Sequence, residues 1–201
     1  MSDAKTVCIV DDDADVRDSL AMLLQRSGYQ TLSFDSARAF LQAGVKGSRH
    51  CVLADIRMPE MDGLALQLEL KRTQPDVPVL IMTGHGDIPM AVQAMKAGAI
   101  DFLEKPFEKP ALLAALERAF EAQTRDDAGN QKIGDHKRQE LTERERAVFN
   151  LLVDGLQNKV IAQKLGISAR TVEVHRRRVM EKTGARNLAE LVKMALSNRT
   201  N

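Results

Sequence analysis

Aromatic residues and cysteines are scarce in this sequence of 201 residues, which has no tryptophan, one tyrosine and two cysteines. Cys8 and Cys51 both lie in short apolar stretches, where we expect reduced core residues rather than the halves of a disulfide. No apolar run approaches the roughly 18 residues that span a bilayer, and the first run ends early, at Asp11. The sequence therefore lacks the features of a signal peptide or a membrane span, and we expect a cytoplasmic protein with no membrane partner.

The net charge is close to zero, but the charges are unevenly distributed along the chain. Residues 1–121 carry 13 basic and 18 acidic side chains, whereas residues 122–201 carry 16 basic and 10 acidic ones. An acidic half could hold a cation and a basic half could meet a polyanion, so the two halves suit different partners. Because a modest basic excess also occurs in proteins that never bind nucleic acid, charge alone does not decide the function.

The first half of the chain alternates between strand-like and helix-like segments. Short apolar runs, each typical of a buried strand, are followed by segments with helical spacing. Strands are expected at residues 6–10, 29–34, 51–54, 78–82 and 99–103, and helices at residues 16–24, 37–43, 63–73, 87–97 and 111–122. Five such pairs predict one α/β domain over residues 1–122, with a parallel sheet covered by helices on both faces.

The second half has a different pattern. Residues 123–139 are polar and lack an apolar period, which predicts a linker. Residues 140–201 are predicted to be helical, and their first helix begins at a capping box formed by Thr142 and Glu145. Further helices are expected at residues 159–165, 169–183 and 188–196. This half is therefore predicted to be a small all-α domain.

Polar side chains follow four of the predicted strands at the point where each strand ends. Asp11 and Asp12 follow the first strand and Asp55 the third, while Thr83 follows the fourth and Lys105 the fifth. Each has an ordinary explanation, since an acidic run is usually a solvated loop and a lone aspartate often caps a helix. Because ligands of parallel sheets bind beyond the carboxyl ends of the strands, the four ends together predict one site.

This combination of side chains indicates a specific chemistry. Converging carboxylates repel one another unless a hard cation lies among them, and Mg²⁺ is the expected cation. A carboxylate beside Mg²⁺ can attack phosphorus as a nucleophile, which gives an aspartyl-phosphate. Lys105 would supply a point charge and Thr83 a hydroxyl to stabilise the transferring phosphoryl oxygens.

With these residues at this spacing, residues 4–122 resemble the receiver domain of bacterial two-component response regulators. Residues 82–90 are similar to the FixJ-type subgroup in particular. The resemblance implies a flavodoxin-like five-stranded parallel sheet in the order 2-1-3-4-5. It also implies that Asp55 is the phosphoacceptor, that Thr83 and Lys105 contact the phosphoryl group, and that the bond between Lys105 and Pro106 is cis.

The same resemblance implies a metal site and a conformational switch. The implied Mg²⁺ ligands are the carboxylates of Asp11, Asp12 and Asp55 and the backbone carbonyl of Arg57. Phe102 matches the aromatic switch position of the family, where it would act together with Thr83. The ordinary alternative for Phe102 is a core aromatic residue on a strand.

Residues 158–172 are predicted to form a helix, a turn at Gly166 and a second helix capped by Ser168. In the second helix, Val174 lies at the centre of a basic face directed away from the apolar stripe. A side chain of this kind can touch a thymine methyl group in a major groove, while arginines reach guanine edges or phosphates. The alternative is a solvated charged helix with an incidental valine.

Residues 139–200 resemble the LuxR-type output domain of the FixJ/NarL family. The resemblance is carried by residues 141–145, 158–159, 161–162, 165, 171–172, 175 and 191–192. It implies that residues 169–183 form the recognition helix. The residues implied to lie nearest the bases are Glu173, Val174 and Arg177. Phosphate contacts are implied for Lys159, Thr171, Arg176, Arg178 and Lys182.

Together, the two halves predict a DNA-binding transcriptional response regulator rather than an enzyme. A sensor histidine kinase would phosphorylate Asp55 with Mg²⁺ present, and the chain would then dimerise or release its DNA-binding half for double-stranded promoter DNA. RNA polymerase is a further expected partner. One alternative is a phosphatase of the haloacid-dehalogenase type, which would use the Asp-x-Asp of Asp11 and Asp13 but leaves Asp55 unexplained. Another is a receiver whose helical half binds protein instead of DNA.

Overall fold

The computed structural model describes residues 4–45, 49–84, 88–124 and 140–197. The chain divides into two compact units, residues 1–87 with 97–127 and residues 88–96 with 128–201. Residues 125–139, most of the predicted linker, and residues 85–87 lie outside the described residues. The domain boundaries drawn from the sequence therefore stay a prediction.

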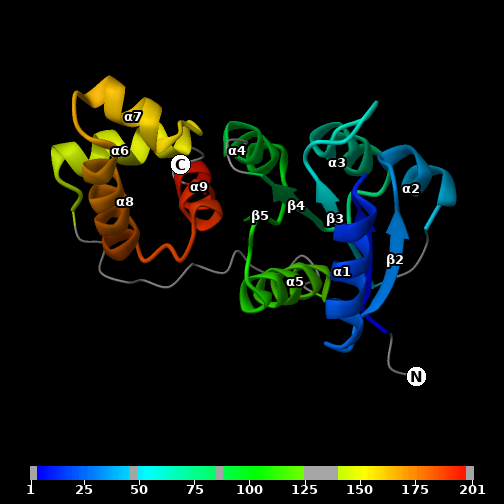
Figure 1. The fold of residues 1–201 in the computed structure, drawn as a ribbon. Coiled ribbons are helices and arrows are strands. Elements are labelled where there is room, and N and C mark those ends of the chain that lie inside the picture. Colours follow the sequence, from blue (N-terminus) through cyan, green and yellow to red (C-terminus); the bar gives the residue numbers. More distant parts are fainter. Residues whose placement is uncertain (1–3, 46–48, 85–87, 125–139, 198–201) are drawn as a thin grey trace. The chain divides into compact units, whose positions relative to one another are not determined.

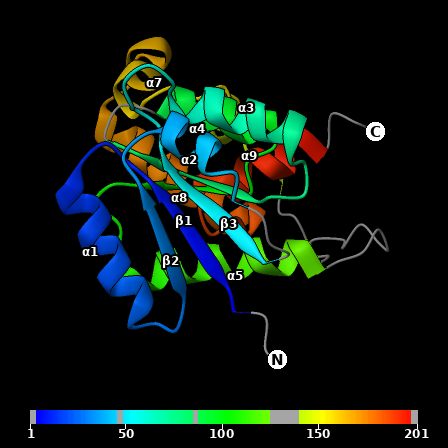
Figure 2. The same cartoon turned by 90° about the vertical axis from the view of Figure 1, so that its right-hand side faces the viewer.

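The first unit is built on a five-stranded parallel sheet with the order β2-β1-β3-β4-β5, which confirms the flavodoxin-like fold. Its strands are β1 (Thr6–Val10), β2 (Gln30–Phe34), β3 (His50–Asp55), β4 (Val79–Thr83) and β5 (Asp101–Glu104). One face is covered by α1 (Ala14–Gln25) and α5 (Lys109–Thr124), and the other by α2 (Ala37–Ala43) and α3 (Gly63–Thr73) (Figures 1 and 2). Helix α4 (Ile88–Ala97) follows β4 in the chain, and all but its last residue are grouped with the second unit.

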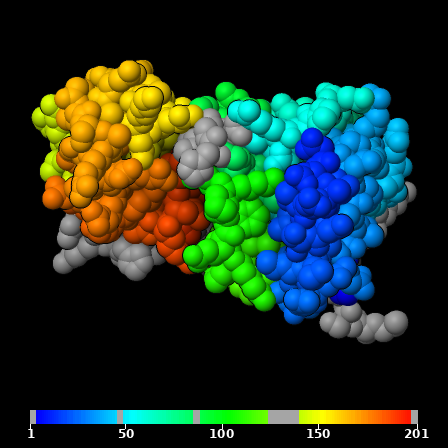
Figure 3. Space-filling view, in the orientation of Figure 1, coloured from blue at the N-terminus to red at the C-terminus, as the bar shows by residue number. Residues whose placement is uncertain are grey.

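A hydrophobic core of the first unit lies between the sheet and helices α1 and α5. Ile9 and Leu53, from neighbouring strands, pack there with Leu24 of α1 and Phe120 of α5. The outer side of α1 forms part of the surface of this unit (Figure 3). Strand β3 is buried along its whole length, as expected for a central parallel strand with helices on both sides. This packing holds the carboxyl ends of the strands, and the polar residues that follow them, at fixed positions.

Both cysteines are buried and unpaired, as predicted. Burial raises the pKa of Cys8 to about 12 and also raises that of Cys51. A thiol with so high a pKa is protonated at neutral pH and is not a nucleophile. The cysteines therefore act as small core residues.

The second unit contains the four predicted helices of the C-terminal half, α6 (Glu143–Val153), α7 (Asn158–Leu165), α8 (Ala169–Thr183) and α9 (Leu188–Ser197). The predicted capping box of Thr142 and Glu145 is present at the start of α6. Gly166 ends α7 with a φ of 65°, in the left-handed region that favours glycine, and the Ser168 hydroxyl caps α8. In the described part of the chain, no helix is both long and apolar enough to cross a membrane.

Candidate functional site

One lysine lies between two aspartates at the carboxyl edge of the sheet. Nζ of Lys105 lies 2.8 Å from Oδ2 of Asp11 and 2.5 Å from Oδ1 of Asp55. The Asp11 side chain is 2% exposed and that of Asp55 is 11% exposed, so the cluster is largely shielded from water but Asp55 remains accessible. The sheet thus brings together three residues that the sequence predicted to meet, from the ends of β1, β3 and β5.

The backbone around Asp55 fixes its carboxylate. The N–H of Arg57 donates to Oδ2 of Asp55 at 2.7 Å, and the N–H of Ile56 donates to the carbonyl of Met82 at 2.8 Å, which ties the end of β3 to β4. A Cβ atom at Gly63 would lie only 2.4 Å from the carbonyl oxygen of Asp55. Helix α3 can therefore begin this close to Asp55 only with glycine at its first position. This role of Gly63 was not predicted, and its only signal in the sequence is a glycine at the start of a helix.

Asp11 is held at each of its oxygen atoms. Besides the contact of Oδ2 with Lys105, Oδ1 accepts a hydrogen bond from the N–H of Asp13 at 3.0 Å. Nη1 of Arg17, on α1, donates to the backbone carbonyl of Asp11 at 2.7 Å. Arg17 was not predicted as part of the site, because its spacing on α1 is that of an ordinary helix residue.

The charges of this cluster are incompletely compensated. Burial raises the pKa of Asp55, and nearby Asp11 adds to this rise, although Lys105 and the Arg57 N–H oppose it. Burial would lower the pKa of Lys105, but its hydrogen bonds to the two carboxylates outweigh this and raise it. A carboxylate whose charge is costly, beside a lysine that stays charged, is the kind of group found at reactive sites.

Thr83 and Phe102 lie near the same edge. Thr83 ends β4 and is fully buried, and its hydroxyl donates to the carbonyl of Gly84 at 3.3 Å. Its own carbonyl accepts from the N–H of Lys105 at 2.7 Å, which links the ends of β4 and β5. Phe102 is buried on β5 with 8% of its surface exposed. The predicted cis bond between Lys105 and Pro106 is confirmed.

The three carboxylates predicted to hold a metal ion lie in different surroundings. Asp12 is exposed, and no three acidic, histidine or cysteine side chains among the described residues form a group that could hold a metal ion. Asp11 and Asp55 do face a common cation, the ammonium group of Lys105. An oxygen-only set with one or two carboxylates and several waters is what Mg²⁺ prefers, so the residues fit this ion.

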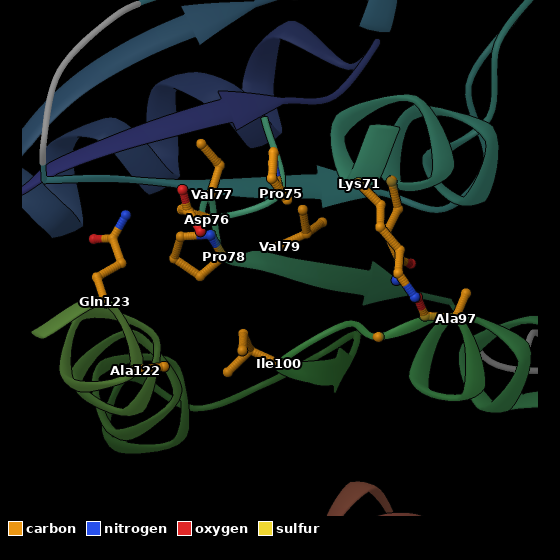
Figure 4. A pocket seen from close by; sticks show the side chains of 12 residues that line it. Lys71, Pro75, Asp76, Val77, Pro78, Val79, Ala97, Ile100, Ala122 and Gln123 are labelled. Atoms are coloured by element: carbon orange, nitrogen blue, oxygen red, sulfur yellow. The ribbon is translucent and has the colours of Figure 1, made fainter. Parts of the chain in front are cut away.

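A hollow of about 280 Å³ lies at the opposite end of β4, where the strand begins. Lys71 from α3 and Gln123 from α5 lie at its two ends, with Pro78 and Ile100 between them (Figure 4). None of the predicted site residues lines this hollow. The hollow is therefore separate from the acidic edge.

In the second unit, the residues predicted to lie nearest the bases share one face of α8. Glu173 and Arg177 are exposed and Val174 is half-buried. Val172 and Val179 are fully buried on the inner face of the same helix. The apolar stripe thus faces the core and leaves the predicted reading face open to solvent.

The residues predicted to contact phosphates differ in their surroundings. Lys159 and Arg178 are exposed, and Thr171 and Arg176 are half-buried. Nζ of Lys182 instead lies 2.7 Å from Oε2 of Glu145 on α6, whose side chain is 3% exposed. Lys182 thus forms an ion pair within the second unit. This pair was not predicted, because its two residues are far apart in the sequence.

Comparisons with known proteins match both units. The family described as "Response regulator receiver domain" matches residues 7–117, and "Bacterial regulatory proteins, luxR family" matches residues 139–195. Transcriptional regulatory protein FixJ of Azorhizobium caulinodans is 49% identical over 98% of this chain and 94% of its own length. Tetrathionate response regulatory protein TtrR of Salmonella typhimurium is 41% identical over 94% of this chain and 90% of its own. Crystallised full-length FixJ from B. japonicum has 44% identity and a TM-score of 0.59, with 100% of both chains covered.

These matches extend over the acidic edge and the helical unit together, whereas the phosphatase alternative accounted for neither Asp55 nor the helices. They assign the helical unit to a DNA-binding family and the whole chain to regulators rather than enzymes. The chain therefore belongs to the two-component response regulators that join a receiver domain to a LuxR-type DNA-binding domain.

Proposed function

We propose that Asp55 accepts a phosphoryl group from a sensor histidine kinase and that this modification controls the binding of double-stranded promoter DNA by the helical unit. The observation that carries the proposal is the carboxylate of Asp55, partly accessible and bridged to Asp11 by Lys105. Its accessibility allows a donor to approach, and its neighbours are suited to neutralising phosphoryl charge. The cytoplasm, where bacterial promoter DNA lies, is the proposed place of action.

In the transfer step, an ionised oxygen of Asp55 attacks the phosphorus atom of a phosphohistidine. A P–O bond forms and the P–N bond breaks, and its electron pair stays on the imidazole nitrogen. Lys105, which already contacts Asp55, holds a transferring oxygen, and the Thr83 hydroxyl holds another. Mg²⁺ would be held by Asp11, Asp12, Asp55 and the backbone carbonyl of Arg57, and it would supply further charge neutralisation.

The phosphoryl group then acts as a switch. It adds about 1.5 to 2 negative charges and three strong acceptors beside Thr83. The Thr83 hydroxyl turns from the carbonyl of Gly84 towards the phosphoryl group, and Phe102 moves inward into the space that opens. The surface of α4, β5 and α5 changes as a result, and the chain forms a homodimer or releases its DNA-binding unit.

The dimer binds a two-part promoter site, with α8 of each chain in the major groove. Glu173, Val174 and Arg177 face the base edges because they occupy the open side of α8. Lys159, Thr171, Arg176 and Arg178 contact phosphates, and RNA polymerase is the partner through which binding changes transcription.

The phosphorylation half is tested by incubating the full chain with a small phosphodonor and Mg²⁺. We expect Asp55→Ala to abolish phosphate incorporation and the donor-dependent gain in dimer and DNA affinity, because it removes the nucleophile. Asp76→Ala, at an exposed aspartate of the same unit, is the matched control. Incorporation into Asp55→Ala would overturn the assignment, and DNA binding that is equal in all conditions would overturn control by the receiver.

The DNA half is tested by comparing duplexes that differ at single base pairs. We expect Arg177→Ala to relax the preference at one position by about 1–3 kcal/mol, because a base-edge contact is lost. Fluorescence anisotropy with a duplex selected from a random library by the wild-type chain measures this preference. An equal loss of affinity on every duplex would make Arg177 a phosphate contact instead.

A further inference from the structure

A buried carboxylate on α6 faces the last turn of α8. Oε2 of Glu145 lies 2.7 Å from Nζ of Lys182 and accepts a hydrogen bond from the N–H of Thr142 at 2.9 Å. The Glu145 side chain is 3% exposed and that of Lys182 is 23% exposed. A carboxylate at this depth needs its partner, because an unpaired buried charge is strongly destabilising.

The Glu145 side of this pair is also held by contacts within α6 that do not involve Lys182. The N–H of Glu145 donates to the hydroxyl of Thr142 at 3.3 Å, which completes the capping box at the start of α6. Glu145 is therefore fixed at both its backbone and its carboxylate. Lys182 is tied to a rigid part of α6 rather than to a mobile surface side chain.

Two other cations of α8, Arg177 and Arg178, are in a different situation. Arg177 and Arg178 are exposed, and neither forms an ion pair with another residue that the structure describes. Nζ of Lys182 also lies 3.4 Å from the carbonyl oxygen of Glu140. The charge of Lys182 is thus neutralised within its own unit, whereas those of Arg177 and Arg178 remain available to an anion.

Apolar packing is not the only contact that sets the rotation of α8. Val172 and Val179 bury the inner face of the helix, but hydrophobic contacts are non-directional. A charge-assisted hydrogen bond is directional, and Lys182 lies about 1.4 helical turns beyond Arg177. The ion pair of Lys182 therefore fixes α8 close to the face that carries Arg177, and it sets the direction in which that face points.

We propose that the ion pair of Lys182 and Glu145 is a positioning device, which orients α8 for base recognition, and that Lys182 is not one of the phosphate contacts. This inference rests on the proposed DNA-binding role of α8. It predicts two separable results, because a phosphate contact changes the salt dependence of binding whereas a positioning residue changes the discrimination between sequences.

The test uses the full chain with a small phosphodonor and Mg²⁺, and a duplex that the wild-type chain has selected from a random library. Affinities for this duplex and for a scrambled one are measured by fluorescence anisotropy over a range of salt concentrations. The variants are Lys182→Met, Lys182→Arg and Glu145→Gln, with Arg178→Met as the matched control. Circular dichroism sets a temperature at which every variant is folded.

We expect Arg178→Met to reduce the slope of log K against log salt by about 0.9 and to weaken both duplexes alike. Lys182→Met and Glu145→Gln should leave the slope unchanged and lower the ratio of selected to scrambled affinity about tenfold. Lys182→Arg, which retains a cationic donor for Glu145, should keep the wild-type ratio.

Two results would overturn the inference while the proposed function stands. A slope lowered by Lys182→Met as much as by Arg178→Met would make Lys182 a phosphate contact. An unchanged ratio in folded Lys182→Met and Glu145→Gln would make the pair a stabilising element only. If the wild-type chain selects no duplex at all, the proposed function itself fails.

Discussion

Each unit of this regulator contains a lysine that is paired with a buried carboxylate, and the two pairs behave in opposite ways. The Nζ–O distance is 2.5 Å between Lys105 and Asp55 and 2.7 Å between Lys182 and Glu145. Burial nevertheless raises the pKa of Asp55, whereas Lys182 and the Thr142 N–H lower the pKa of Glu145 to about 2. Similar Nζ–O distances therefore accompany pKa shifts of opposite direction in the two carboxylates.

The neighbours of each pair explain the difference. Lys105 serves two carboxylates, so Asp55 shares its cation with Asp11 and keeps an unfavourable charge. Glu145 shares Lys182 with no other carboxylate among the described residues and receives a backbone N–H as well. An ion pair with a compensated carboxylate holds structure together, while an under-compensated carboxylate is where a new cation finds favourable contacts.

Removing the lysine should affect the two ion pairs very differently, and this is the largest effect that we expect. We expect Lys105→Met to slow phosphorylation of Asp55 by a small phosphodonor about 100-fold or more, because a fixed cation no longer stabilises the transferring oxygens. Lys182→Met should leave this rate unchanged. Time courses on phosphate-affinity gels measure the rate, and Lys109→Met, at an exposed lysine of the first unit, is the control. A wild-type rate in Lys105→Met would show that the lysine is not part of the transfer step.

Only part of this difference between the two units could be predicted from the sequence. The acidic edge could be predicted because parallel strands bring their carboxyl ends to one place, so the position of Asp11, Asp55 and Lys105 after strands was sufficient. The helices of the second unit could be predicted from the capping box and the spacing of apolar residues. Both predictions rest on local sequence patterns that have the same structural consequence in proteins generally.

The remaining features depend on close approach between particular atoms. The need for glycine at position 63 comes from the carbonyl of Asp55, and the contact of Arg17 is with a backbone oxygen. Lys182 looked like one more cation on a basic helix, and only the packing of α8 on α6 reveals Glu145 as its partner. Spacing along the chain carries no signal for such contacts.

A side chain at position 63 should disturb only the first unit, close to Asp55. We expect Gly63→Ala to lower the free energy of unfolding of the first unit by about 1–3 kcal/mol, because the added methyl group displaces either α3 or the carbonyl of Asp55. Tyr29 is the only tyrosine and the chain has no tryptophan, so its fluorescence during urea unfolding reports this unit. Ala65→Ser, at an exposed position of α3, is the control. Unchanged stability would mean that α3 shifts at no cost.

Replacing each carboxylate with its neutral amide should change the stability of the two units in opposite directions. Asp55→Asn removes an unfavourable charge, so we expect it to stabilise the first unit by about 1 kcal/mol while abolishing phosphorylation. Glu145→Gln removes a favourable charge but keeps a carbonyl for the Thr142 N–H, and we expect it to destabilise the second unit. Urea unfolding at neutral pH, followed by Tyr29 fluorescence and far-ultraviolet circular dichroism, measures both. A shift of the same sign in both variants would contradict the distinction between the pairs.

The smallest effect that we expect is a difference in the pH at which the two carboxylates stop influencing stability. Glu145 has a pKa of about 2 in the folded chain against an ordinary 4.5, so its stabilising contribution is present above pH 4.5 and lost as the pH falls towards 2. The pKa of Asp55 is raised above its ordinary 3.8, so the destabilising cost of its charge is relieved as the pH falls through that raised value. On acidification, the difference in free energy of unfolding between wild type and Asp55→Asn should therefore disappear first. The difference between wild type and Glu145→Gln should disappear at lower pH. Urea midpoints over this range measure the order, and the reverse order would mean that Glu145, not Asp55, carries the under-compensated charge.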